Sequence, residues 1–196
     1  MPDKDVVSIG VTGHRFLAEL DRVVSGVDSA LKIISQTYPS PRYHILSAIA
    51  EGADRIVADR GAEILSASLV AVLPMSLRDY LTDFESRSSR EEFRRLLRSA
   101  SQVIELQGSQ NRSASYVNAG RYIADHSDIL VAVWDGLPAQ GRGGVGDIVA
   151  YCRSRGKPLV IVSAGNRKPG TEEPTTLGAA QGTVTCERLA LSGGSA

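Results

Sequence analysis

The residues best suited to hold a charged ligand form a glycine-dense turn in the second half of the chain. An apolar run that ends at Trp134 leads into this turn, and an amphipathic pattern follows it. Glycines let a backbone approach a ligand closely, and the first amides of a helix have no acceptor of their own, so the turn suits a phosphate group. We expect ligand contacts from Asp135, Gly136, Arg142, Gly143, Gly144, Val145, Gly146 and Asp147.

Three further motifs, at residues 10–15, 47–54 and 116–121, stand where a strand would meet a helix. They offer hydroxyls and carboxylates for a sugar, guanidinium groups for a phosphate and an aromatic ring for stacking. Helix capping by Asp54 and core packing of Tyr116 are the alternatives for those two residues. The residues that we expect to contact a ligand are Thr12, Gly13, His14, Arg15, Ser47, Glu51, Gly52, Asp54, Tyr116 and Arg121.

A group that could catalyse a reaction is harder to identify than a phosphate site. The sequence has no Walker lysine pattern, no GxSxG elbow and no His/Glu pair at metalloprotease spacing. The candidate catalytic carboxylates are Glu51 and Asp147, and Asp147 could equally face a sugar hydroxyl, hold a metal or cap its helix. We expect no required cofactor and no dedicated metal site, with Mg²⁺ bound at Asp135 or Asp147 as an option.

Apolar runs and helical periodicity alternate along the chain. Strands are expected at residues 6–11, 44–47, 69–73, 103–106, 129–134 and 159–162. Helices are expected at residues 20–34, 52–65, within 76–101, 116–125 and 144–155. This alternation predicts an α/β fold, a Rossmann-like open, mostly parallel sheet with helices on both faces. In such sheets ligands bind beyond the carboxyl ends of the strands, where all four motifs would lie.

Composition favours one nucleotide-binding domain over residues 1–164. Residues 165–196 form a Gly/Pro/Ser/Thr-rich C-terminal extension, with an edge strand or short helix at 183–191 and a partly mobile end. The 196 residues are 42% hydrophobic and 22% charged, enough apolar material for a real core.

Charge and cysteine usage exclude several classes of protein. With 22 basic and 22 acidic side chains, the chain has no global field to concentrate nucleic acid or hold an anionic membrane. Cys152 and Cys186 are far apart and have no zinc-ligand spacing, which favours a reducing compartment. The first apolar run has about six residues, too few for a signal peptide or a membrane span, so we expect a cytoplasmic protein without membrane contact.

Five segments, taken together, resemble the SLOG superfamily of Rossmann-like proteins. They are VTGHR at 11–15, SAIAEGAD at 47–54, LP at 73–74, WDG at 134–136 and GGVG at 143–146. The resemblance covers about residues 6–163. The superfamily includes the LOG cytokinin-activating phosphoribohydrolases, the DNA-processing protein A family and nucleotide-sensing domains of bacterial defence and stress systems. The resemblance therefore implies a nucleotide ligand and a glycine-rich phosphate-binding loop.

The sequence departs from both of the better-known groups in that superfamily. LOG enzymes carry Pro-Gly-Gly-x-Gly-Thr-x-x-Glu with a catalytic glutamate, and here Arg142 replaces the proline, Asp147 the threonine and Ala150 the glutamate. An N-glycosidase would need a substitute for that carboxylate, with Glu51, Asp135 and Asp147 available. The DNA-processing family carries Ser-Gly-x-Ala-x-Gly-Ile-Asp, where this chain has Ala48 and Ala53 at two of the defining positions.

Three functions follow from these observations. The leading hypothesis is a domain that binds or senses a nucleotide or nucleotide-derived ligand. The alternatives are an N-glycosidase or phosphoribohydrolase acting on nucleoside monophosphates, and a single-stranded nucleic-acid-binding adaptor, which the balanced charge and few aromatic residues disfavour. By analogy with related folds, we also expect a homo-oligomer.

Overall fold

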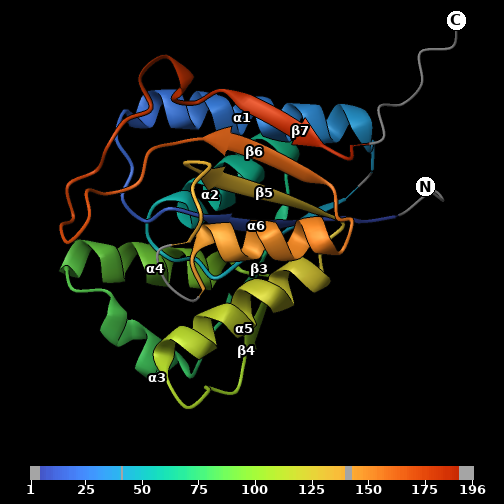
Figure 1. The fold of residues 1–196 in the computed structure, drawn as a ribbon. Helices are drawn as coiled ribbons and strands as arrows, with labels where there is room; N and C mark the ends of the chain where they lie inside the picture. The colour runs from blue at the N-terminus through green and yellow to red at the C-terminus, as the bar shows by residue number, and fades with distance from the viewer. Residues whose placement is uncertain (1–4, 41, 140–142, 190–196) are drawn as a thin grey trace, which may run out of the picture.

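The computed structural model describes residues 5–40, 42–139 and 143–189. These residues form a seven-stranded sheet with helices on both faces, which confirms the predicted α/β Rossmann-like fold (Figure 1). The strand order is β4-β3-β2-β1-β5-β6-β7, and every neighbouring pair is parallel except β6 and β7. The strands are β1 (Val7–Gly13), β2 (Tyr43–Ser47), β3 (Ser68–Leu73), β4 (Gln102–Glu105), β5 (Ile129–Trp134), β6 (Leu159–Ser163) and β7 (Val184–Glu187).

Three of the helices that join these strands begin at capping side chains, and Ser76, which accepts a hydrogen bond of 3.2 Å from the Asp79 amide, caps the shortest of them. Asn111 accepts a hydrogen bond of 2.9 Å from the Ala114 amide, and Ser86 accepts one of 3.0 Å from the Ser89 amide. Such acceptors satisfy amides that have no partner within the helix. The helices are α1 (Leu20–Thr37), α2 (Ala53–Leu65), α3 (Leu77–Tyr80), α4 (Arg87–Ser99), α5 (Arg112–Asp125) and α6 (Val145–Ser154), with 3₁₀ turns η1 (Leu81–Asp83) and η2 (Gly178–Ala180).

An apolar core lies on each face of the sheet. On one face α1, α2 and α4 cover Ile9 and Val131, and on the other α5 and α6 cover Leu130 and Ile161. Figure 1 shows α5 and α6 running together across one side of the sheet. Because successive residues of a strand point to opposite faces, a central strand between two helix layers must be apolar at every position. This requirement explains the unbroken apolar run of β5.

The connections that follow β1 and β5 run in opposite directions across the sheet. β2, β3 and β4 lie on one side of β1, whereas β5, β6 and β7 lie on the other. The carboxyl ends of β1 and β5 therefore form the point at which the strand order reverses, and loops diverge there to leave a crevice. Gly13 and Trp134, the last residues of these two strands, mark its floor.

The segment after β6 returns to the sheet. Of the two forms predicted for residues 183–191, the structure shows the edge strand, β7, antiparallel to β6. The approach to β7 packs closely on α1, since a Cβ on Gly26 would lie 2.4 Å from the Gly182 carbonyl oxygen. Gly182 itself has φ +80°, a conformation that favours glycine. The last residues of the predicted extension lie outside the described residues.

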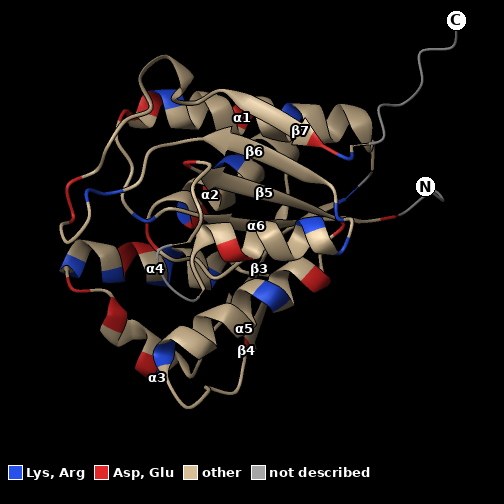
Figure 2. Ribbon diagram, in the orientation of Figure 1, with Lys and Arg blue, Asp and Glu red and all other residues tan. Residues whose placement is uncertain are grey.

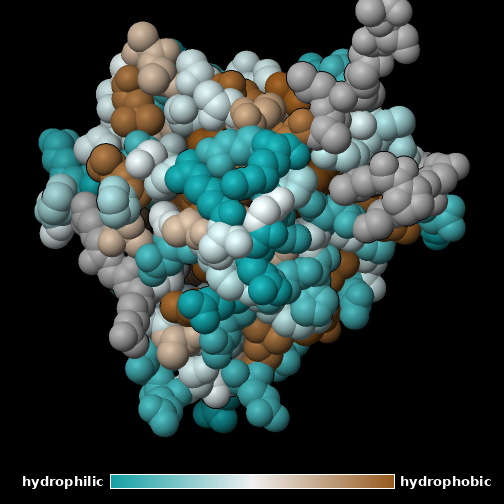
Figure 3. Space-filling view, turned by 45° about the vertical axis from the view of Figure 1, so that its right-hand side comes forward, coloured by the Kyte–Doolittle hydropathy of each residue, from teal (hydrophilic) through white to brown (hydrophobic). Residues whose placement is uncertain are grey.

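Charges of both signs are distributed over the helices (Figure 2). On α4, Arg87 pairs with Glu91 at 2.8 Å and Arg95 reaches Asp59 of α2 at 2.6 Å. Figure 3 shows hydrophilic residues interspersed with smaller hydrophobic groups on the side of the molecule that it draws. Within residues 5–40, 42–139 and 143–189, no helix combines the length and apolar character needed to cross a membrane.

Candidate ligand-binding site

A cavity of about 380 Å³ lies at the carboxyl ends of β1 and β5. The starts of α2 and α6, one face of α5 and the α3–η1 segment enclose it. The structure brings most of the predicted residues together in its wall. These are Thr12, Gly13, His14, Arg15, Asp54, Tyr116, Asp135, Gly143, Gly144, Val145 and Gly146.

Six other predicted residues do not line this cavity, and Arg142 lies outside the described residues. Ser47 is buried at the end of β2, where it accepts a hydrogen bond of 2.9 Å from the Ile49 amide. Arg121 and Asp147 line a separate groove between α5 and α6. The remaining three, Glu51, Gly52 and Gly136, belong to turns beside the cavity, and Gly52 lines a second hollow near the start of α1.

The turn after β1 packs tightly against the start of α2. Gly52 has φ +77°, and a Cβ on it would lie 2.4 Å from the Arg15 carbonyl oxygen. The Ala53 amide donates a hydrogen bond of 3.1 Å to the His14 carbonyl oxygen. Position 52 therefore requires glycine, because its φ is positive and because there is no space for a Cβ. This contact fixes the direction in which the turn presents His14 and Arg15.

His14 joins the ends of β1 and β5. Its Nε2 accepts a hydrogen bond of 3.1 Å from the Asp135 amide and lies 3.4 Å from the Asp135 carboxylate. Burial lowers the pKa of His14, although the nearby charge of Asp135 acts in the opposite direction. An imidazole that accepts at Nε2 is neutral and carries its proton on Nδ1. His14 is therefore a neutral side chain that links the ends of β1 and β5 through its hydrogen bond with the Asp135 amide.

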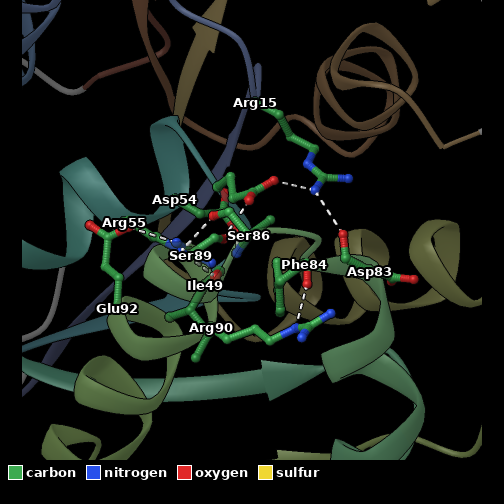
Figure 4. A network of polar contacts seen from close by, with 12 residues as sticks. Arg15, Ile49, Asp54, Arg55, Asp83, Phe84, Ser86, Ser89, Arg90 and Glu92 are labelled. Carbon is green, nitrogen blue, oxygen red and sulfur yellow. Dashed lines mark hydrogen bonds and ion pairs between the residues drawn. The ribbon is translucent and has the colours of Figure 1, made fainter. Parts of the chain in front are cut away.

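Arg15 lies at the mouth of the crevice in a polar network (Figure 4). Its Nη2 donates to the Glu51 carboxylate and lies 3.4 Å from the Asp83 carbonyl oxygen, and Ser89 of α4 donates to the other Glu51 oxygen. Burial would raise the pKa of Glu51, but the hydrogen bonds from Ser89 and Arg15 outweigh it and lower that pKa. Glu51 is thus an ionised, fully engaged carboxylate outside the cavity wall.

The backbone amides of the glycine-dense turn differ in whether a described residue accepts a hydrogen bond from them. The Gly143 amide, which precedes α6, donates a hydrogen bond of 2.9 Å to the Asp147 carboxylate, so this contact ties the turn to the first turn of the helix. The amides of Val145 and Gly146 have no hydrogen-bond acceptor among the described residues. A Cβ on Gly146 would lie 2.7 Å from the Ala139 backbone nitrogen, so glycine permits the close packing of the 137–139 loop. Two unpartnered amides at the start of α6 therefore remain for an anion.

Asp54 contributes a buried carboxyl to the cavity wall from the first turn of α2. It is 7% exposed and accepts a hydrogen bond of 3.3 Å from the Ala50 amide. Burial raises its pKa to about 6, against the opposing effect of hydrogen bonds from Ala50, Ser47 and Ala48. A carboxyl with such a pKa changes its charge near neutral pH.

Several residues of the wall were not identified from the sequence. Tyr80, Asp83 and Phe84 come from the charged segment 76–101, which separates into α3, η1 and α4. Asp83 accepts hydrogen bonds from Tyr116 and Arg112 of α5, which ties this segment to the other side of the crevice. The only sequence signal was the pair of aromatic residues within a charged stretch. Asn166 and Arg167, from the loop after β6, are two further polar residues of the wall that the sequence did not identify.

The described residues include no cluster of three or more His, Cys, Asp or Glu side chains that could hold a metal ion. The site is accordingly built from two amides, arginine side chains and hydroxyl-bearing or carboxyl side chains.

The chain thus has the predicted Rossmann-like fold, with a crevice at the point where the strand order reverses. No known family profile and no curated protein matches the sequence. Among solved structures, DNA processing protein A (DprA) from Streptococcus pneumoniae is similar, with a TM-score of 0.53 and 15% identity over 79% of this chain and 49% of that chain. This chain thus spans about half the length of that protein. The molybdenum cofactor carrier protein of Chlamydomonas reinhardtii aligns over 79% of this chain and 75% of its own, with 19% identity and a TM-score of 0.43.

Proposed function

We propose that this protein binds or senses a nucleotide or another phosphate-bearing small molecule in the crevice between β1 and β5. The observation that carries the proposal is the pair of amides on Val145 and Gly146, which have no acceptor among the described residues and lie at the start of a helix that lines a cavity of about 380 Å³. Such amides and the helix dipole favour an anion. The cavity has the size of a small-molecule site.

Arginine side chains support the same proposal. Arg15 and Arg167 line the crevice. The Arg15 pKa is raised because the hydrogen bond and charge of Glu51 outweigh the opposing effect of burial. A permanently charged guanidinium that lines the same cavity as the Val145 and Gly146 amides suits a phosphate.

Nucleic acid fits the chain less well than a small molecule. DprA is named for DNA processing, but a DNA-binding surface needs a concentration of basic side chains. Here the net charge is zero, and many arginines are paired with carboxylates, such as Arg60 with Asp28 and Arg153 with Glu187. We therefore propose a small-molecule ligand rather than nucleic acid. A homo-oligomer stays a prediction from fold analogy, which light scattering can test.

The test is isothermal titration calorimetry with AMP, ADP-ribose, cyclic ADP-ribose and NAD. We expect at least one of them to bind wild-type protein. Arg15→Gln should weaken that binding about tenfold or more, because a hydrogen bond to a charged group contributes about 1.5–3 kcal/mol. Arg121→Gln is the matched control, since Arg121 lies on α5 but lines the separate groove. Absence of binding by every ligand, or equal effects of the two substitutions, would refute the proposal.

A further inference from the structure

One corner of the crevice carries a tyrosine hydroxyl that forms no hydrogen bond with any described residue. Tyr80, in α3, is 3% exposed and lines the cavity. No described residue forms a hydrogen bond with its Oη, which nevertheless is not sealed from the cavity. The ring is buried while the hydroxyl opens to the cavity, so a ligand bound there can complete the hydrogen bonding of this phenol.

Asp54 belongs to the same corner. Both residues line the cavity, and the charge of Asp54 adds to the effect of burial in raising the Tyr80 pKa, which indicates that the two groups interact electrostatically. Asp54 Oδ2 accepts the hydrogen bond from the Ala50 amide. Ser47 and Ala48 also donate to this carboxylate, whose two oxygens offer about four acceptor sites, so capacity remains to accept one hydrogen bond from a ligand.

The chemistry of these two groups selects what can bind there. A carboxylate only accepts hydrogen bonds, whereas a phenol both donates and accepts. The small uncharged group that donates to a carboxylate and accepts from a phenol at once is a hydroxyl. An anionic group would be repelled by Asp54, and by Asp83, whose oxygens are already engaged by Tyr116 and Arg112.

We propose that Asp54 and Tyr80 bind a sugar hydroxyl of the ligand, so that the crevice selects ribose-type phosphates over their deoxy counterparts. The inference rests on the proposed function, in which the phosphate binds at the Val145 and Gly146 amides. The ligand is then anionic at one end and carries uncharged hydroxyls at the other. Tyr80 determines specificity by donating a hydrogen bond to the oxygen of the sugar hydroxyl. Asp54 does so by accepting a hydrogen bond from the same hydroxyl.

Calorimetry with paired probes tests this inference. Wild-type protein should bind ribose 5-phosphate more tightly than 2-deoxyribose 5-phosphate, or AMP more tightly than its 2′-deoxy or 3′-deoxy analogue, by about five- to tenfold. Tyr80→Phe should lower affinity for the hydroxylated probe by a similar factor and leave the deoxy probe within about twofold. The phenylalanine keeps the ring that packs edge-on against Phe84 and Phe93.

Tyr151→Phe is the matched control, because Tyr151 lies in the groove between α5 and α6. It should leave both affinities unchanged, and thermal unfolding should show that Tyr80→Phe remains folded. If phosphates bind and respond to Arg15→Gln, but Tyr80→Phe leaves the ribose-to-deoxyribose ratio unchanged, this inference fails and the proposed function stands. Tighter binding of 2′-amino-AMP than of AMP at neutral pH would also overturn it, because the corner would then select an amine.

Discussion

Replacing Asp54 with asparagine should change how the stability of the protein depends on pH. Asp54 is buried at the start of α2, and its pKa is raised to about 6. In the unfolded chain the same carboxyl returns to its ordinary value, near 3.8. Asparagine has nearly the same shape and keeps an acceptor for the Ala50 amide, but it does not titrate.

The direction and size of the effect follow from this difference in pKa. Between about pH 4 and pH 6 the folded state holds the Asp54 proton more strongly than the unfolded state, so the free energy of unfolding falls as the pH rises. A pKa raised from 3.8 to about 6 corresponds to a loss of about 3 kcal/mol, at about 1.36 kcal/mol for each tenfold change in proton affinity. The loss is complete above the folded-state pKa, near pH 7.

Urea denaturation at several values between pH 4 and pH 7 measures this directly. The free energy of unfolding of wild type minus that of Asp54→Asn should fall by about 2–3 kcal/mol over this range. Taking the difference removes the contributions of the other carboxylates. Asp21→Asn, an exposed position in the first turn of α1, should give a nearly constant difference. A flat difference for Asp54→Asn would show that the carboxyl is solvated in the folded protein and would refute the argument from burial.

Three further changes test the core and the turn. Phe93→Ala should lower the free energy of unfolding by about 3–5 kcal/mol in urea, since Phe93 is fully buried, whereas Val103→Ala at the exposed sheet edge should cost below about 0.5 kcal/mol. Gly13→Ala would place a Cβ 2.3 Å from the Ala53 Cβ and should cost about 1–3 kcal/mol by the same assay. Native protein at pH 8 should react with a disulfide reagent at Cys186 alone, because burial raises the pKa of Cys152 to about 11.

The sequence predicted the strands well where both faces of a strand are buried. β5 spans the predicted residues 129–134, because six apolar residues are followed directly by Asp135 and Gly136. β1 runs to Gly13 rather than to Val11, because Thr12 and Gly13 continue to pair with β5 although neither is a large apolar residue. Backbone pairing, which the hydrophobic pattern does not record, sets that boundary.

The roles of individual carboxylates could not be predicted, because they depend on distant partners. The sequence left three roles open for Asp147, and in the structure its carboxylate accepts a hydrogen bond from the Gly143 amide and lies outside the cavity wall. Glu51 accepts from Ser89, which is 38 residues further along the chain and on another helix. Local spacing identifies a carboxylate near a site, but long-range packing decides whether it is free to act.

The α3–η1 segment shows why a charged stretch can form part of a binding site. Its surface is polar, yet the rings of Tyr80 and Phe84 turn inward and pack with Phe93 of α4, with ring centroids 4.8–5.7 Å apart. The buried Arg55 guanidinium lies 5.0 Å from the Phe84 ring, which adds a cation–π contact. Because the core fixes these rings, the Tyr80 hydroxyl is held at the cavity without relying on a hydrogen bond of its own. In the proposed ribose site, the aromatic cluster would therefore supply the rigidity that the Tyr80 hydroxyl needs to discriminate between ligands.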